Sequence, residues 1–538
     1  MQPIKMKNIN KLSAYIGGAI LAGGMFLSSC TDKFESWNIN PDEVTEDMMD
    51  RDNLKTGALY SQMQRGVFIV GQDKGGTYQI HQMLNGDNYA GYLANIKDSY
   101  DIGSRHHDHY SMQSKWFTNP FDDTYPEIMQ PWKTICESTD EGAMDRAMAT
   151  VVKVFGMHRM TDKYGPIPYS KFGTDIAVPY DSQQDIYNQF FNELDDAITV
   201  MSDYLNTGAS TYLARYDNVY SGNVAKWLKF ANTLRLRLAM RISYVDETKA
   251  RTEIQKAIDS PAGLMTSAAD DAILHNNTNG FTFTNPIYEV TQSFNDMRMS
   301  ATMDCYLNGY NDPRLAAYYL PNSKGEYRGM RNGMTSEFSS MAAVTSASNF
   351  KSDSDLPWMH AAEAYFLLAE AKLRFGLGSG DVKDLYEQGI RASFASAGVT
   401  SGVDGYIAND TDVPNDTWTN PANNQNVNVS SMVSSLPVAW DDAADTETKL
   451  ERIMIQKWIA LYPDGQEAWS EMRRTGYPGW VRINTYSYAS GVSNNDIIRR
   501  IQFSTTELTN NSANVQAAIQ LLGGQDNAGT RLWWDVKR

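Results

Sequence analysis

Residues that could carry out catalysis do not fall into any familiar catalytic motif in this chain. Its 538 residues contain no nucleophile elbow, H-E-x-x-H, C-x-x-C, phosphate-binding loop or G-x-G-x-x-G. Adjacent acids occur, as at Asp122–Asp123 and Asp195–Asp196, but glycosidase chemistry depends on how far apart two carboxyl groups lie in space. Neighbouring acids are typical of solvated faces, so the sequence predicts a protein that is not an enzyme and needs no cofactor.

A histidine-rich tract is the strongest candidate for a metal site. Three of the seven histidines lie in Arg105-His106-His107-Asp108-His109. Their imidazoles could bind a metal together with Asp108. However, adjacent side chains point in different directions, and short histidine tracts are more often solvated loops. The acidic stretches 353–355 and 410–412 lack the glycine and distal glutamate of a calcium loop. We therefore predict no metal site.

Aromatic residues are the main candidates for ligand binding, since the chain has 30 Tyr, 12 Trp and 19 Phe. A sugar ring presents C–H groups that pack on an aromatic plane, while its hydroxyls bond to polar side chains. Tyr92, Trp116, Tyr288 and Tyr327 lie in segments without periodicity, near polar neighbours, and are the predicted ligand-binding residues. A peptide would use the same rings. Alternatively, these rings only pack the irregular segments onto the rest of the protein, because large aromatic residues are mostly buried.

We interpret the stretch Leu450–Pro478 as the central part of the scaffold that must position these rings. Apolar residues recur at helical spacing from Leu450 to Tyr462, and Pro463-Asp464-Gly465 interrupts the helix. A second helix is expected from about Gln466 to Thr475. Arg473 and Arg474 fall in its last turn, where cations complement the helix dipole, and Gly476 and Pro478 follow in the order that ends a helix.

Further helices with an apolar stripe are expected along most of the chain. Their approximate bounds are 53–70, 143–164, 185–204, 223–244 and 247–258. Within 223–244, Arg235, Arg237 and Arg241 alternate with leucines, which predicts a basic polar side. The 34 residues from Ala361 to Phe394 hold two helices around a glycine-rich turn and match the tetratricopeptide period. The sequence thus predicts a mainly α fold: tetratricopeptide-like helix pairs forming one scaffold, with long irregular insertions at about 71–131, 261–350 and 400–440.

The N-terminus has the features of a processing signal. Lys5, Lys7 and Lys11 precede an apolar or small stretch, 12–27, which is too short and glycine-rich for a comfortable membrane span. Leu27-Ser28-Ser29-Cys30 resembles a bacterial lipoprotein cleavage site, which implies that residues 1–29 are removed and Cys30 is acylated. The alternative is an ordinary secretory signal in which Cys30 is coincidental. Residues 30–538 would then form a single domain.

The net charge excludes one class of ligand, and the cysteine content bears on disulfide bonds. The net charge of −17 argues against nucleic acid, since binding phosphates needs a basic surface. Apart from Cys30, only Cys136 and Cys305 remain. Two lone thiols are more often buried than bridged, so we expect them to be unpaired.

Four blocks of sequence stand out in order along the chain: Lys163–Ser170 (KYGPIPYS), Ala362–Ala371 (AEAYFLLAEA), the QKW…EAW…RRTGYP part of Leu450–Pro478, and Arg531–Asp535 (RLWWD). Together they resemble the SusD/RagB family of nutrient-binding lipoproteins. The segment from Arg499 to Asn510 also lies where that family has an arginine–glutamate–asparagine pattern. Each block alone is a degenerate pattern, but their joint order behind a lipoprotein signal makes the resemblance strong.

The resemblance implies both a fold and a role. Members are built on tetratricopeptide-type helix pairs, sit on the outer face of the outer membrane and cap a SusC-like, TonB-dependent transporter. They capture oligosaccharides, or in some members peptides, and pass them to the transporter. No ligand-binding residue can be carried over, because the insertions do not align. Two other classes stay open: a surface glycan hydrolase with a carboxylate pair among its aromatic loops, and a purely structural lipoprotein.

Overall fold

The computed structural model describes residues 53–97, 101–102, 105–334, 338–483, 491–493 and 496–537. The predicted signal peptide and Cys30 lie outside these ranges. Thr56–Arg538 form one compact unit. Among the described residues, no helix is long and apolar enough to span a membrane.

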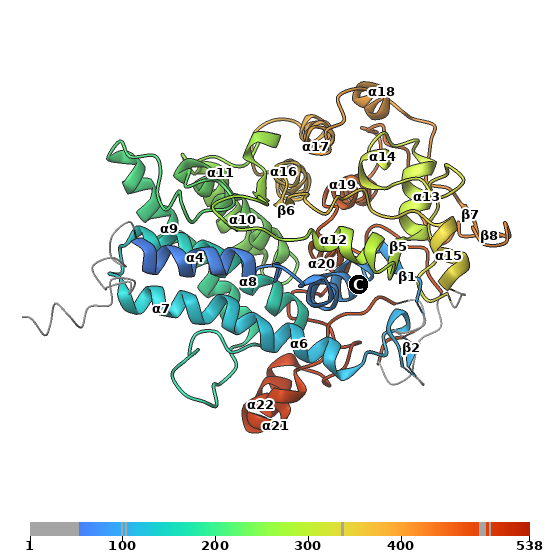
Figure 1. Ribbon diagram of the computed structural model, residues 1–538. Coiled ribbons are helices and arrows are strands. Elements are labelled where there is room, and N and C mark those ends of the chain that lie inside the picture. Colours follow the sequence, from blue (N-terminus) through green and yellow to red (C-terminus); the bar gives the residue numbers. More distant parts are fainter. Residues whose placement is uncertain are drawn as a thin grey trace, which may run out of the picture. The chain divides into compact units, whose positions relative to one another are not determined.

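Helices make up most of the described chain (Figure 1). In the first half they are α4 (Leu54–Gly66), α5 (Gly75–Tyr78), η2 (Gln79–Asp87), η4 (His107–His109), α6 (Ser114–Thr124), η5 (Tyr125–Met129), α7 (Gln130–Ser138), α8 (Met144–Tyr164), α9 (Gln183–Asn206), α10 (Val224–Arg241), α11 (Glu247–Asp259) and η6 (Ala268–Asp270). In the second half they are α12 (Pro286–Tyr288), η7 (Glu289–Ser293), α13 (Ala301–Gly309), α14 (Leu315–Tyr318), α15 (Phe338–Val344), α16 (Ala362–Phe375), α17 (Val382–Ser396), α18 (Val403–Ile407), α19 (Thr446–Ala460), α20 (Gly465–Thr475), α21 (Thr505–Asn510) and α22 (Ser512–Leu522).

Strands are short and, within the described ranges, form only two-stranded antiparallel sheets. The pairs are β1 (Leu93–Asn95) with β5 (Met297–Met299), β2 (Asp101–Ile102) with β3 (Arg105–His106), β4 (Ala272–Leu274) with β6 (Leu356–Met359), and β7 (Thr417–Thr419) with β8 (Asn426–Asn428). The β1–β5 pair joins residues about 200 apart in sequence, with Leu93 opposite Met299 and Asn95 opposite Met297. It therefore ties two of the predicted insertions together.

Side-chain caps set where the long helices begin. Ser182, Asn223, Asp246, Asp381 and Asp445 each accept a hydrogen bond from a backbone N–H in the first turn of α9, α10, α11, α17 and α19. Such caps satisfy donors that have no partner within the helix. At the other end, Gly376 and Gly476 close α16 and α20 in the left-handed conformation that glycine adopts without strain.

The mainly helical prediction is confirmed, with most expected helices within a few residues of their observed bounds. Consecutive helices pack as the pairs α8–α9, α10–α11 and α16–α17, and α19 packs on α16 and α17 (Figure 1). Whether these pairs are of the tetratricopeptide type stays a prediction. Both Cys136 and Cys305 are free, as expected.

The first predicted insertion, about 71–131, is not irregular as expected. It contains η2 and the continuous run of α6, η5 and the start of α7. Pro120, Pro126 and Pro131 divide the run into short pieces and wide helical turns shift the period between them, so no single helical spacing holds along it. The second and third insertions are less regular, although α13 and α14 lie within 261–350.

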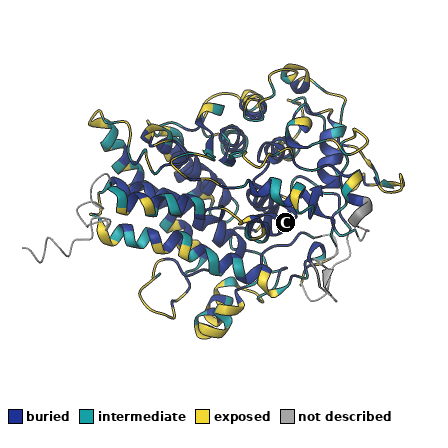
Figure 2. Cartoon of the chain, in the orientation of Figure 1, coloured by how far each residue is buried: buried dark blue, intermediate teal, exposed yellow. Residues whose placement is uncertain are grey.

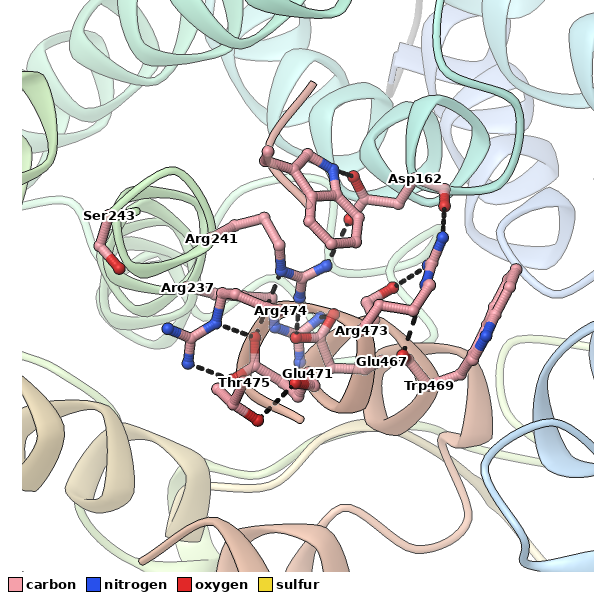
Figure 3. A network of polar contacts seen from close by, with 12 residues as sticks. Asp162, Arg237, Arg241, Ser243, Glu467, Trp469, Glu471, Arg473, Arg474 and Thr475 are labelled. Carbon is pink, nitrogen blue, oxygen red and sulfur yellow. Dashed lines mark hydrogen bonds and ion pairs between the residues drawn. The ribbon is translucent and has the colours of Figure 1, made fainter. Parts of the chain in front are cut away.

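Charged side chains are buried in the centre of the molecule, where α20 meets α8, α10, α16 and α19 (Figure 3). We call this group the buried ion network: Asp162, Arg237, Arg241, Glu363, Glu370, Lys457, Glu467, Glu471 and Arg474. Figure 2 shows the surrounding helices largely in the buried colour, with exposed faces on α21 and α22. The prediction that Arg237 and Arg241 form a basic polar side is therefore wrong, because both face acids inside the protein.

Every cation of the buried ion network has a carboxylate partner. Arg474 bonds to Glu370 through both guanidinium ends, at 2.7 and 2.6 Å, and to Glu471 at 2.6 Å. Arg241 bonds to Asp162 at 2.6 Å and to Glu467, and lies 3.3 Å from Glu471. Paired, bidentate geometry offsets much of the cost of removing these charges from water.

A second paired cation links α10 to α16. Arg237 forms a fork with Glu363 at 2.8 and 2.5 Å. Lys457 of α19 donates to Glu471 at 2.8 Å. The network thus bonds four helices to α20 or to one another through charge-assisted hydrogen bonds, which are stronger than neutral ones.

Replacing Arg474 with methionine tests the network. Glu370 and Glu471 would lose their common partner, although Glu370 keeps Arg374 and Glu471 keeps Lys457. We therefore expect the free energy of unfolding to fall by roughly 3 kcal/mol, the lower end of the usual cost of breaking a buried ion pair. Urea unfolding of the purified protein measures it. The matched control is Arg391→Met, which breaks the exposed Arg391–Asp404 pair (2.6 Å) and should change stability by about 1 kcal/mol or less. Equal effects of the two substitutions would contradict the assignment.

The network also predicts a loss of stability in acid. Burial alone would raise the pKa of Glu471 and Glu467, but the neighbouring arginines outweigh burial and hold both pKa values below the ordinary value of about 4.5. The unfolded chain then binds more protons than the folded one, so stability is full above about pH 4.5 and falls as the pH drops toward the folded-state pKa values. Urea midpoints measured from pH 7 to pH 3 should show this decline. The decline should be shallower in Glu471→Gln, and an equally steep decline would argue against this origin.

Candidate functional site

Two of the four predicted ligand-binding rings are buried in the core. Tyr92 packs against Trp458 and Tyr462, at ring-centroid distances of 5.3 and 5.4 Å, and its hydroxyl donates to the carbonyl of Trp458. Trp116 lies edge-on to His107 at 5.3 Å and is 3% exposed. Neither ring has a face on which a sugar could stack. Packing of these segments onto α19 and its neighbours, the alternative drawn from the sequence, accounts for both.

Tyr288 and Tyr327 are half-buried and remain available to a ligand. Tyr288 ends the short helix α12, whose first turn is capped by the side-chain oxygen of Asn285. Tyr327 lies three residues before Met330, which pairs with Ser300 at the end of β5. Asn308 of α13 donates to the carbonyl of Tyr327 at 3.0 Å. Both rings are therefore held on segments that flank β5, one on each side in sequence.

A buried carboxylate joins the segments around β1. Asp108 accepts hydrogen bonds from Asn88 at 2.8 Å, from Asn95 at 2.5 Å and from the backbone N–H of Gly333 at 3.1 Å. The guanidinium of Arg482 donates to the Asp108 carbonyl at 2.9 Å. We call this set the Asp108 junction.

The Asp108 junction continues into the segment that carries Tyr327. Asn332 donates to the carbonyl of Leu93 at 2.9 Å, and its own carbonyl accepts from the N–H of Ile483 at 3.0 Å. Residues 88–95, 108, 332–333 and 482–483 are thereby locked together, although they come from distant parts of the chain. The junction gives the Tyr327 segment a rigid support, which a binding surface needs.

The histidine tract contributes to this packing. His107 is fully buried, stacks on Tyr89 at 5.3 Å, and contacts the Leu84 carbonyl through Nε2 at 2.8 Å. Burial lowers the pKa of His107 below its ordinary value, which favours the neutral imidazole. The expectation of a solvated loop is wrong for His107 and Asp108. Within the described ranges, no three His, Cys, Asp or Glu side chains are grouped to hold a metal ion.

Two open grooves were not predicted from the sequence. One, of about 540 Å³, is lined by Tyr125, Phe172, Ile176 and residues of α21. The rings of Tyr125 and Phe172 stack at 5.5 Å, while Glu507 at its edge already accepts hydrogen bonds from Tyr180 and Asn511. The other, of about 570 Å³, has Trp132 on its wall among charged and amide side chains of α7, α8 and α9. We call the second one the Trp132 groove.

Neither groove has a local sequence signature. Trp132 lies one residue beyond the predicted insertion 71–131, and its groove partners are up to 68 residues away on two later helices. A half-exposed tryptophan beside polar helix faces was the only signal that could have indicated it. Such a signal is weak, because tryptophans on amphipathic helices usually face the core.

Comparison with known proteins agrees with this architecture. The structure matches a chitin-binding SusD homologue from Flavobacterium johnsoniae with a TM-score of 0.84 and 37% identity, covering 90% of this chain and 99% of that one. SusD homologues from Bacteroides uniformis (36% identity, TM-score 0.81) and Bacteroides thetaiotaomicron (34%, 0.82) match over the same shares of the chains. No curated protein matches.

The family comparison covers nearly the whole chain. The sequence model described as SusD-like, SusD and RagB outer membrane lipoprotein, matches residues 36–535. The match includes α4 to α22 and each of the four sequence blocks that carried the resemblance. The chain belongs to the SusD-like family of outer-membrane lipoproteins.

Proposed function

We propose that this protein is a cell-surface receptor that captures oligosaccharides without altering them and delivers them to a SusC-like, TonB-dependent transporter in the outer membrane. The observation that carries the proposal is the likeness to the chitin-binding homologue, at 37% identity over 90% of this chain. Relatives this similar over their full length generally share the scaffold on which a binding site is built, whereas the ligand itself is decided by the site.

The arrangement of the half-buried aromatic residues supports binding rather than turnover. Tyr288 and Tyr327 are half-buried, and the half-buried Arg328 follows Tyr327 in sequence. A sugar needs such a platform and hydrogen-bonding groups but no catalytic pair. The Asp108 junction keeps the segment that carries Tyr327 fixed, so little ordering of that segment is needed on binding.

Substituting Tyr288 and Tyr327 with alanine tests the binding surface. Each substitution removes a stacking plane, so we expect the dissociation constant for N-acetylchitohexaose to rise about tenfold or more, or about 1.4 kcal/mol in binding free energy. Isothermal titration calorimetry of the purified chain measures it. Tyr365→Ala, at another half-buried tyrosine that donates to the Thr266 carbonyl at 2.9 Å, is the matched control and should bind normally.

Two outcomes would contradict the oligosaccharide receptor, and a third would contradict only its binding surface. They are shortened sugar products after incubation, binding of oligopeptides in place of every oligosaccharide tried, and unchanged affinity in both tyrosine variants. Chromatography of the incubated sugar detects products. The first outcome would indicate a hydrolase, the second a peptide receptor, and the third a binding surface elsewhere on the protein.

The lipid anchor at Cys30 and the outward orientation are tested in cells. Several acyl chains on one residue give stable membrane attachment, so Cys30→Ser should abolish labelling by a clickable fatty acid and release the protein from the membrane fraction. Proteinase K added to intact cells should digest the wild-type protein. The wild-type chain, purified in detergent from the outer membrane, should carry a TonB-dependent transporter with it. Persistent fatty-acid labelling of Cys30→Ser would refute the anchor.

A further inference from the structure

We propose that the Trp132 groove is a second oligosaccharide-binding site, separate from the surface at Tyr288 and Tyr327. Its ligand class, a neutral oligosaccharide, rests on the proposed function. The groove lies where α7, α8 and α9 meet, whereas Tyr288 and Tyr327 flank β5. Its volume of about 570 Å³ falls within the range of small-ligand sites.

Trp132 is held as a rigid platform. Its indole Nε1 donates to the hydroxyl of Thr150 at 3.0 Å, which fixes the ring's rotation. The ammonium of Lys153 lies 3.5 Å from the ring centroid. Lys153 is 1% exposed and bonds to Glu193 at 2.7 Å, so it covers the inner face of the ring. A ring fixed on one face by a buried cation keeps its orientation when a ligand contacts the other side.

Polar side chains around this platform are left for a ligand. Arg146, Glu141 and Asp196 line the groove. In the part of the chain that the structure describes, no hydrogen bond or ion pair engages any of these three side chains. They supply a fork of N–H donors and two carboxylate acceptors, which together match the mixed donor and acceptor pattern of sugar hydroxyls.

The charge of the groove selects among sugars. Glu193 on its wall is neutralised by Lys153, which leaves the carboxylates of Glu141 and Asp196 against a single lining cation, Arg146. A uronic acid or sulfated sugar would face like charges there, which is unfavourable at short range. A neutral pyranose can instead lay its C–H face on Trp132 and donate hydroxyl protons to the acids. The geometry therefore points to neutral oligosaccharides.

The test uses calorimetric titration of the mature chain with four neutral hexaoses, those of N-acetylglucosamine, cellulose, xylan and starch. We expect at least one hexaose to occupy two sites on the wild-type chain. Trp132→Ala should remove one of them, and Arg146→Ala should weaken that site about fivefold or more. Because Arg146 has no partner to lose, Arg146→Ala remains informative even if Trp132→Ala unfolds. The matched control is Trp440→Ala, at a half-buried tryptophan whose Nε1 bonds to Asp442 at 2.9 Å.

Each result decides between the two sites. Identical isotherms for wild type, Trp132→Ala and Arg146→Ala would overturn the groove and leave the proposed receptor function intact. Binding that survives Tyr288→Ala with Tyr327→Ala but is lost in Trp132→Ala would support the groove and remove the site at the tyrosines. If no hexaose binds the wild-type chain, both proposals fail.

Discussion

Pairing of charges inside the protein is the constraint on which the rest of this structure depends. Arg474, Glu370 and Glu471 are all but excluded from water and are tolerable there because they are paired, with Arg374 also on Glu370 and Lys457 also on Glu471. The bonds run from α20 to α10, α16 and α19, so a displacement of one helix would leave an unpaired ion on another. Close packing also holds α20 in place. A side chain at Gly465 would put its Cβ 2.3 Å from the Asp87 carboxylate, so only glycine allows η2 to lie directly against the start of α20.

Much of the fold could be predicted from the sequence, because apolar spacing and caps are local signals. The turn at Pro463-Asp464-Gly465 and the end at Gly476 were both expected, and α19 and α20 begin and end accordingly. What failed was the inference about the polar side of α10. Arg473 and Arg474 do lie in the last turn of α20, as expected, but Arg474 is also paired with Glu370, 104 residues away. Periodicity reveals a polar residue but not the distant partner that allows it to be buried.

The exposure of the candidate ligand-binding residues was harder to predict, for a related reason. Tyr92 and Trp116 lie in a segment without a clear period, but Tyr92 directly precedes β1, Trp116 lies in α6, and both are buried in the core, so the lack of period did not indicate an exposed loop. Tyr288 and Tyr327 have the exposure that a binding residue needs. Trp132 needed three helices to be placed before its surroundings could be recognised. Exposure is a tertiary property, and aromatic composition alone does not report it.

Because the ion network is buried, the packing of its helices should not depend on the salt concentration of the surrounding solution. Dissolved salt weakens attraction between charges mainly where ions can approach, within a Debye length of about 8 Å in a physiological solution. Mobile ions cannot reach Arg474 or Glu471, so the helices that these residues join stay together in dilute and in briny surroundings alike. An outer-membrane lipoprotein of this fold thereby keeps a core whose charge pairing does not depend on the salt around it.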